Sequence, residues 1–392
     1  MKLYKSTEIC RSCLRDLRPI IDLGHVPIPR FKAGEDPDYA PLTLALCEHC
    51  GLAQLLDTVE PDMLFKEFWY ESGISNTMRR QLRDVADAAS QFLKPGDVLL
   101  DIGCNDGTMF DYIPRDVYKI GFEPSQLAKK ARSKADLIVQ DYFVQSPSKA
   151  DVITAIAMFY DLDDPNSFVE DVATSLQDDG VFIIQQNYLP DMLKNNGVDN
   201  IVHEHIEYYS LSSLIPLLER HGLYTFHVER NHVNGGSLRT YSSKDKRLVQ
   251  LSVERMLRDE RKLNLVSFRP YKLFGRRVRE LKEETMFFLE QKINRGEKIH
   301  VLGASTRGNT LLHFYGIDHD LIEAASERNP AKWGGEIVGT DIPIVSEKES
   351  REMDPDYYLV LPWYFRKEIA ERETESRARL IFPLPELTVH GD

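Results

Sequence analysis

The chain has 392 residues, of which 62 are acidic and 49 are basic, so its formal net charge is −13 at pH 7. This acidic balance disfavours sequence-independent nucleic-acid binding, which needs a basic surface to neutralise phosphates. No apolar run approaches the roughly 18 residues that cross a bilayer, and the first residues lack the apolar core of a signal peptide. We therefore expect a cytoplasmic protein of two or three domains that binds neither nucleic acid nor membrane.

Four of the five cysteines lie within the first 50 residues, in a segment with short apolar runs and several prolines. They form two C-x-x-C pairs, Cys10 with Cys13 and Cys47 with Cys50. Two such pairs complete a tetrahedral Zn²⁺ site without an open position, so the metal would be structural. It would supply folding energy that this core-poor segment lacks, although redox-active or unliganded thiols are the alternative. We predict an irregular zinc-binding module over residues 1–65.

Alternation of helix and strand begins after this module. Residues 66–95 are predicted to be helical, with Ser75 as the N-cap. Aliphatic runs follow at 97–103, 118–122, 136–139, 151–157 and 180–186, most of them separated by helical stretches. This alternation predicts βαβ units and a parallel sheet. Residues 223–229 and 237–242 are candidates for late, antiparallel strands that close the sheet.

Residues 247–295 are charged and helical, with only Pro270 interrupting, and the α/β alternation restarts after Gly296. The predicted fold class is α/β. Its parts are the N-terminal zinc-binding module, a central Rossmann-like domain over 66–246, and a helical bridge with a second Rossmann-like α/β domain over 247–392.

A glycine loop follows the first strand of the central domain. Asp101, Gly103 and Gly107 form a D-x-G-x-x-x-G pattern, which lets backbone approach a ligand and aims a helix N-terminus at it. The G-x-G-x-x-G fingerprint of dinucleotide binding is absent. Glu123 and Asp141 follow the next two strands, where they can accept the ribose hydroxyls and the adenine amino group of S-adenosylmethionine (SAM). The pattern fits the SAM loop of class I methyltransferases, so we expect the class I SAM-methyltransferase Rossmann-like fold for residues 66–246; an ordinary sheet with turn glycines is the alternative. The expected cofactor residues are Asp101, Gly103, Asn105, Asp106, Gly107, Glu123, Pro124, Asp141, Tyr142 and Phe143.

Motifs along nearly the whole chain resemble the zinc-containing, SAM-dependent nucleotide-sugar C-methyltransferases, which make branched deoxysugars. The motifs are CRSC…CEHCGLAQL, DIGCNDGTMF, AMFYDLDDPNSF, QQNYLPDML, HEHIEYYSLSSL, NGGSLR and GASTRGNTLLHF. The resemblance implies methyl transfer from SAM to a carbon, usually C3 of a 4-keto sugar nucleotide. It also implies that the C-terminal domain helps to hold the nucleotide-sugar.

The motif His203-Glu204-His205 is the expected place of the catalytic base. A carbon beside a ketone is acidic only when its enolate is stabilised, so the enzyme needs a base over the C–H and donors near the oxygen. The resemblance places the base on His205, with Glu204 orienting it, and the pKa of histidine suits this task. A structural role or a metal site are the alternatives, but positions i and i+2 are poorly spaced for joint ligation on a helix.

Val202 stands where related sugar methyltransferases often carry tyrosine, so that hydroxyl is missing or comes from elsewhere. Tyr70 is the main candidate to replace it, and we count Tyr70 and His203 among the catalytic residues. In the last domain, residues 303–310 form another loop-to-helix anion site, in which Arg307 replaces the common lysine of relatives. The expected substrate-binding residues are Asn187, Tyr188, Tyr208, Tyr209, Arg239, Ser305, Arg307, Asn309, Arg328, Lys332 and Trp333.

The sequence therefore predicts a SAM-dependent C-methyltransferase that acts on a keto-sugar linked to dTDP, GDP, CDP or UDP, as a monomer or weak homodimer. Methyl transfer to oxygen or nitrogen is one alternative. Another is enolate chemistry without methylation, as in an epimerase or cyclase, and a third is a non-catalytic nucleotide-sugar binder.

Overall fold

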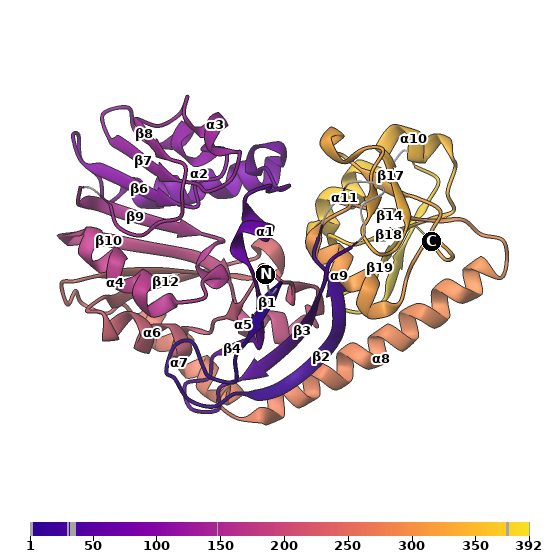
Figure 1. The fold of residues 1–392 in the computed structure, drawn as a ribbon, viewed down its shortest axis with the longest axis horizontal. Coiled ribbons are helices and arrows are strands. Elements are labelled where there is room, and N and C mark those ends of the chain that lie inside the picture. The colour runs from indigo at the N-terminus through magenta and orange to yellow at the C-terminus, as the bar shows by residue number, and fades with distance from the viewer. Residues whose placement is uncertain (1–2, 30, 32–36, 147, 374–375, 392) are drawn as a thin grey trace.

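The computed structural model describes residues 3–29, 31, 37–146, 148–373 and 376–391. Two α/β lobes stand side by side, and N-terminal strands and one long helix run beneath them (Figure 1). Within the described ranges, no helix combines the length and the apolar character needed to cross a membrane.

The N-terminal module is more regular than predicted. A four-stranded antiparallel sheet has the order β11-β4-β3-β2, and β1 (Tyr4–Ser6) pairs with β5 (Asp57–Val59). Alternate residues of β3, including Leu42 and Leu44, are fully buried, and Pro19 and Pro27 lie on the edge strand β2, where a missing N–H is tolerated. The strands are β2 (Arg18–Pro27), β3 (Tyr39–Leu46), β4 (Ala53–Leu55) and β11 (Glu207–Tyr208). The strand β11 lies far along the chain from β4, with which it pairs. The short apolar runs of residues 1–65 therefore could not predict the complete sheet.

The central lobe contains a seven-stranded sheet in the order β12-β13-β10-β9-β6-β7-β8. Strands β6 to β10 are parallel, and β13 lies antiparallel between β10 and β12, so the strand predictions are confirmed. The strands are β6 (Val98–Ile102), β7 (Tyr118–Phe122), β8 (Leu137–Val139), β9 (Ala150–Ile156), β10 (Leu176–Asn187), β12 (Tyr224–Asn231) and β13 (Ser237–Ser243). The order reverses at β6, which places a crevice at the carboxyl ends of β6 and β9.

Helices cover both faces of this sheet, and the strands are buried on both sides. Leu99 and Val152 pack with α2, whereas Leu100 and Ile153 pack with α4 and α6. The helices from the N-terminal module to β12, including α1 and α5, which pack elsewhere, are α1 (Pro61–Phe65), α2 (Asn76–Ser90), α3 (Ala128–Ala131), α4 (Pro165–Ser175), α5 (Leu189–Lys194) and α6 (Leu211–Arg220).

The helix predicted over 66–95 is shorter in the structure. Ser75 is the N-cap as expected, and its side chain accepts from the N–H of Met78. The residues before Ser75 instead lie on the cofactor loop, where the N–H of Gly73 donates to Asp106 at 2.9 Å. A Cβ at Gly73 would lie 2.4 Å from that carboxylate, so the close approach requires glycine.

The C-terminal lobe holds a second seven-stranded sheet, in the order β16-β17-β15-β14-β18-β19-β20. Its strands are β14 (Ile299–Leu302), β15 (Ala325–Glu327), β16 (Glu336–Ile337), β17 (Ile342–Ser346), β18 (Tyr357–Val360), β19 (Arg379–Phe382) and β20 (Thr388–His390). Its helices are α9 (Thr306–Tyr315), α10 (Glu347–Glu352) and α11 (Arg366–Arg372). Strands β17, β15, β14, β18 and β19 are parallel, which gives a second Rossmann-like domain.

Helices α7 (Leu251–Leu263) and α8 (Phe268–Ile293) form the predicted bridge. Pro270 lies in the first turn of α8, where its missing N–H costs nothing. Helix α8 runs beneath the C-terminal lobe (Figure 1), and its Phe274 and Val278 share one core with Ile21 and Leu42 of the N-terminal sheet. The domain boundaries at 65/66 and 246/247 stay a prediction.

Candidate active site

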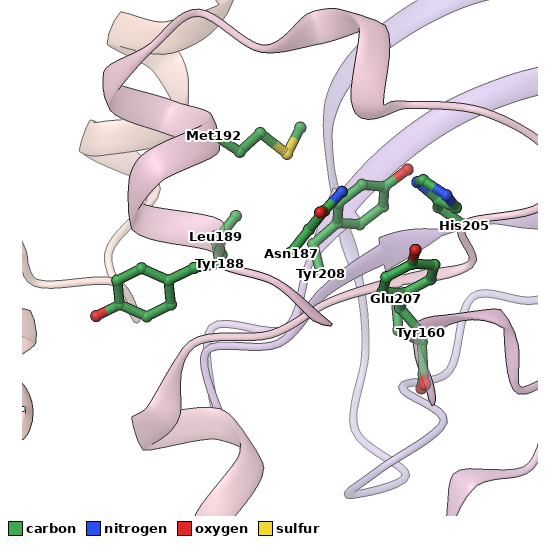
Figure 2. Close-up of a pocket in the computed structure, with 8 residues that line it drawn as sticks. All are labelled: Tyr160, Asn187, Tyr188, Leu189, Met192, His205, Glu207 and Tyr208. Carbon is green, nitrogen blue, oxygen red and sulfur yellow. The ribbon is translucent and has the colours of Figure 1, made fainter. Parts of the chain in front are cut away.

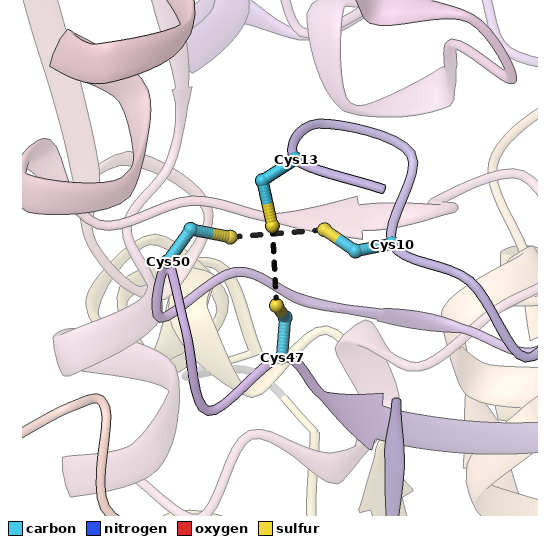
Figure 3. A group of neighbouring side chains, drawn as sticks. All are labelled: Cys10, Cys13, Cys47 and Cys50. Atoms are coloured by element: carbon cyan, nitrogen blue, oxygen red, sulfur yellow. Dashed lines mark hydrogen bonds between the residues drawn. The ribbon is translucent and has the colours of Figure 1, made fainter. Parts of the chain in front are cut away.

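The four N-terminal cysteines meet in one cluster (Figure 3). Their sulfur atoms all lie within 4.8 Å of one another, with Cys10 Sγ 3.7 Å from Cys50 Sγ and Cys13 Sγ 3.4 Å from Cys47 Sγ. These distances exceed the roughly 2.05 Å of a disulfide and are close to the edge of about 3.8 Å in a tetrahedron with Zn–S of about 2.3 Å. Gln54 Nε2 donates to Cys10 Sγ at 3.1 Å, as expected around a metal thiolate. The cluster fits structural zinc.

The cofactor loop after β6 is held by Glu123 at the end of β7. The N–H of Asn105 donates to Glu123 Oε2 at 2.8 Å, and the N–H of Ser125 donates to Oε1 at 2.9 Å. Gly103 and Gly107 have φ of 73° and 72°, and a Cβ at either would lie about 3 Å from Met158 or Ala131. The glycines therefore permit the close packing that keeps this loop near the strand ends.

Other predicted cofactor residues have different surroundings. Asp101 is buried and accepts from Thr154 Oγ1 at 2.6 Å, and burial raises its pKa to about 7. Asp141 and Tyr142 are exposed after β8, whereas Phe143 packs against Phe122 with ring centroids 5.1 Å apart. Asp106 accepts from Gly73 and Thr108 and so shapes the loop itself, and the half-buried Pro124 follows Glu123.

His205 lies half-buried after the turn of the His-Glu-His motif. Its Nδ1 is 3.2 Å from the carbonyl oxygen of Asn200, and its ring lies against Tyr160. A carbonyl can only accept, so Nδ1 carries the proton and Nε2 keeps its lone pair. Burial, with the charge of Arg307 as the second cause, lowers the pKa of His205 to about 3. The imidazole is therefore neutral at neutral pH and can accept a proton, but its pKa lies further below neutrality than the ordinary histidine value on which the sequence prediction relied.

Among the described residues, neither His203 nor Glu204 makes a hydrogen bond to His205, so the expected orienting contact from Glu204 is not seen. Glu204 is buried, burial raises its pKa to about 7, and its Oε2 has no partner in the described part of the chain. His203 Nε2 lies 3.1 Å from the carbonyl oxygen of Val26, which ties the motif to β2, and burial lowers the pKa of His203 to about 4.

A small cavity lies beside His205 (Figure 2). It is lined by Tyr160, Asn187, Tyr188, Leu189, Met192, His205, Glu207 and Tyr208. Asn187 Nδ2 donates to Asn200 Oδ1 at 2.6 Å, and the Tyr208 hydroxyl donates to the Asn200 carbonyl at 3.1 Å. Asn200 thus contacts His205 and also Asn187 and Tyr208, which are two of the predicted substrate-binding residues.

Three predicted substrate residues have partners elsewhere. The Tyr188 hydroxyl points away from His205 (Figure 2) and donates to Glu260 at 2.7 Å. The Tyr209 hydroxyl donates to buried Glu207, also at 2.7 Å. Arg239 is buried in β13 and is paired with Asp84, Glu229 and Gln185.

The C-terminal lobe brings the start of α9 to the histidine motif. Ser305 caps α9 by accepting from the N–H of Gly308 at 3.0 Å. Arg307 binds Asp199 of the central lobe through two N–H groups, and its guanidinium lies 4.2 Å from the Tyr364 ring centroid. Tyr70 is 46% exposed as a whole residue, while desolvation of its phenol by the surrounding protein raises its pKa.

The loop after β14 repeats the geometry of the cofactor loop. Glu327, at the end of β15, accepts from the N–H of Ala304 on Oε2 and from the N–H of Asn329 on Oε1, both at 2.8 Å. Gly303 has φ of 91° and donates to the carbonyl before Glu327, as Gly103 donates to the carbonyl before Glu123. A glycine and a strand-end glutamate are therefore arranged alike in both lobes.

Predicted residues surround this second loop. Lys332 Nζ donates to the Ala304 carbonyl at 2.6 Å, and Trp333, which is 46% exposed, donates from Nε1 to the Glu327 carbonyl at 2.8 Å. Arg328 lies within 4 Å of Glu347 and Glu368. Buried Asn309 has no hydrogen-bond partner for either side-chain polar atom within the described residues.

Comparison with known proteins identifies the chain. Three family models match it in series: "Putative zinc binding domain" over 10–65, "Methyltransferase domain" over 75–228 and "C-methyltransferase C-terminal domain" over 232–385. C-methyltransferase NovU of Streptomyces niveus is 28% identical over 410 residues, covering 98% of this chain and 97% of that protein. The chain belongs to the zinc-containing, SAM-dependent C-methyltransferases. This assignment replaces the oxygen or nitrogen transfer that the sequence left open.

Solved structures cover less of the C-methyltransferase. Mitomycin 7-O-methyltransferase MmcR is 21% identical, with 43% of this chain and 55% of that chain covered and a TM-score of 0.36. Magnesium protoporphyrin IX methyltransferase of Synechocystis PCC 6803 is 12% identical, with 42% and 82% covered and a TM-score of 0.36.

Sequence reasoning missed several groups of the C-methyltransferase site. The sequence could not indicate the role of the Asn200 carbonyl, because every residue has a backbone carbonyl group. Tyr160 lies in the motif AMFYDLDDPNSF, and Trp363 and Tyr364 lie in residues 362–365. Only the fold brings Tyr160 to His205, Trp363 to Asp199 and Tyr364 to Arg307. Glu327 had a usable signal: it ends a strand that follows a glycine loop, as Glu123 does.

Proposed function

We propose that this C-methyltransferase methylates the carbon next to the ketone of a nucleotide-linked 4-keto-deoxysugar, at C3. The arrangement of Glu327 carries this proposal. Its carboxylate is fixed by two backbone N–H groups at a strand end, as Glu123 is. A carboxylate at the switch point of a Rossmann-like sheet accepts ribose hydroxyls. One nucleoside, of SAM, would occupy the central lobe, and the second, of the sugar nucleotide, the C-terminal lobe.

The groups between the two lobes support proton removal from carbon. His205 Nε2 takes the proton, since Nδ1 is bound to the Asn200 carbonyl. Burial raises the pKa of Tyr160 well above its ordinary value, so its hydroxyl stays protonated and can donate to a developing enolate oxygen. SAM supplies the methyl group that the carbanion accepts. Tyr70, which precedes α2, and Arg307, in the first turn of α9, are further proposed donors.

The diphosphate needs donors in the same lobe as the second nucleoside. Ser305 opens α9 at an N-terminus where backbone N–H groups favour anions. Arg328, Asn309, Lys332 and Trp333 stand around the loop, and we propose them as contacts to the diphosphate or nucleoside.

A methyl-transfer assay tests this function. The enzyme is incubated with SAM and with dTDP-, GDP-, CDP- and UDP-linked 4-keto-6-deoxysugars, and products are analysed by mass spectrometry. We expect one sugar nucleotide to gain a single methyl group with stoichiometric S-adenosylhomocysteine. In deuterated water, the same substrate should exchange its C3 hydrogen when SAM is replaced by S-adenosylhomocysteine. Exchange without methylation in the presence of SAM would favour an epimerase or cyclase, and neither reaction with any keto-sugar would refute the proposal.

A further inference from the structure

A buried carboxylate joins the two lobes next to the base. Asp199 lies in the short helix η4 (Val198–Asn200) and is 1% exposed. Three N–H groups of the C-terminal lobe converge on its Oδ2: Arg307 Nε at 2.9 Å, Arg307 Nη2 at 2.5 Å and Trp363 Nε1 at 3.1 Å. A buried carboxylate held by an arginine and a further donor has a strongly determined position, because leaving it unpaired is costly.

The residue that follows Asp199 holds the base. The Asn200 carbonyl accepts from His205 Nδ1 at 3.2 Å and from the Tyr208 hydroxyl at 3.1 Å. The ion pair is thus one residue away from the hydrogen bond that decides which imidazole nitrogen carries the proton. A displacement of this carbonyl would release Nδ1 and allow the proton to move to Nε2, the nitrogen that must stay free.

Arg307 makes two further contacts besides its ion pair with Asp199. Its Nη1 donates to the Asn234 carbonyl at 3.2 Å, and its guanidinium lies over the Tyr364 ring. Arg307 is therefore held from three sides and cannot readily follow Asp199 if the ion pair is altered. Besides Asp199, Arg307 is held by Asn234 of the central lobe and by Tyr364 of the C-terminal lobe, so the short η4 segment is the part that must adjust.

We infer that Asp199 is a positioning residue for methyl transfer: held by Arg307 and Trp363, it fixes the Asn200 carbonyl that keeps His205 in the tautomer with Nε2 free. The role of His205 as base rests on the proposed function, whereas the tautomer does not. Without this anchor the base is misplaced or carries the wrong proton. Since a misplacement of about 1 Å costs on the order of 100-fold in rate, turnover should fall while SAM still binds.

The test compares Asp199→Asn, Asp199→Ala and Trp363→Phe with the parent enzyme. Glu373→Gln is the matched control, because Glu373 is also a buried carboxylate held by two arginines, Arg351 and Arg372, within the C-terminal lobe. Each full-length protein is labelled with ¹⁵N-histidine, and the His205 signals are assigned by their loss in His205→Gln. Chemical shifts of the two ring nitrogens then report the tautomer without any substrate.

We expect the parent and Glu373→Gln to hold His205 as the Nδ1–H tautomer. Asp199→Ala should shift His205 to a mixture or to the Nε2–H tautomer, and Trp363→Phe should change it less, since it removes one of three donors. With the sugar nucleotide that the parent enzyme methylates, kcat should fall by about 10- to 100-fold in Asp199→Ala, with little change in SAM affinity.

An unaltered His205 tautomer in all three variants would overturn the inference. If Asp199→Ala does not fold, Asp199→Asn and Trp363→Phe decide the question. If no sugar nucleotide is methylated, the proposed function fails, while the tautomer still tests Asp199.

Discussion

The imidazole of His205 lies against the phenol ring of Tyr160, with ring centroids 4.3 Å apart and an interplanar angle of 56°. Tyr160 is 6% exposed and His205 is half-buried, so the ring contact and the Asn200 carbonyl together leave one edge of the imidazole for the substrate. The contact joins the segment after β9 to the segment before β11 and gives the base two supports.

His205→Gln should lower kcat by about 10²- to 10⁴-fold, the usual contribution of a general base, while the dissociation constant of SAM stays within about twofold. Calorimetry measures the binding and mass spectrometry the turnover. Tyr160→Phe keeps the ring contact and should retain more activity than Tyr160→Leu, which loses it. Full activity in His205→Gln would remove this residue as the base.

Glu123→Ala and Glu327→Ala should each weaken the binding of a different ligand. Each removes a charged acceptor for ribose hydroxyls, which is worth about 1.5–3 kcal/mol, or roughly 10- to 100-fold in affinity. We expect Glu123→Ala to weaken SAM binding and Glu327→Ala to weaken binding of the sugar nucleotide, both measured by calorimetry at equal thermal stability. If both variants weakened the two ligands equally, the assignment of one nucleoside to each lobe would be wrong.

Cys10→Ser should lower zinc content and thermal stability together. Removing one thiolate opens a structural site whose metal contributes directly to folding. Atomic absorption and thermal unfolding provide the two readings, and a strong chelator should produce the same fall in Tm in the parent enzyme. Cys104→Ser is the control, because Cys104 is a buried thiol outside the cluster and should leave the zinc content unchanged. A loss of stability at full zinc content would contradict the structural site.

His203 should make the enzyme less stable in acid. Burial lowers its pKa from 6.5 to about 4, so between these values the unfolded chain binds a proton that the folded chain does not. Stability therefore falls as the pH drops from 6.5 towards 4, by up to about 3 kcal/mol from this group. Denaturant unfolding across this range should show a smaller fall for His203→Gln than for the parent. An equal fall in stability in both proteins would contradict the assignment of this pH dependence to His203.

The parallel strands of the central lobe were predictable from aliphatic runs alone, because strands buried on both faces must be continuously apolar. Residues such as Leu99 and Leu100 show this directly, since they point to opposite faces and are both fully buried. The N-terminal sheet was not predictable in this way. Its β11, at Glu207–Tyr208, lies about 150 residues from the strand that it pairs with, Ala53–Leu55, and no local pattern encodes such a partner.

The sequence by itself determined the two sites whose chemistry depends on the spacing of residues along the chain, the cysteine cluster and the cofactor loop. Two C-x-x-C pairs can place four sulfur atoms on one metal wherever the pairs meet, and Gly103 and Gly107 are needed for positive φ in the cofactor loop. Only the tertiary structure decided the surroundings of the base. The Asn200 carbonyl, the Tyr160 ring and the Asp199–Arg307 pair come from separate segments, and a hydrogen bond between distant groups depends on packing rather than on residue type.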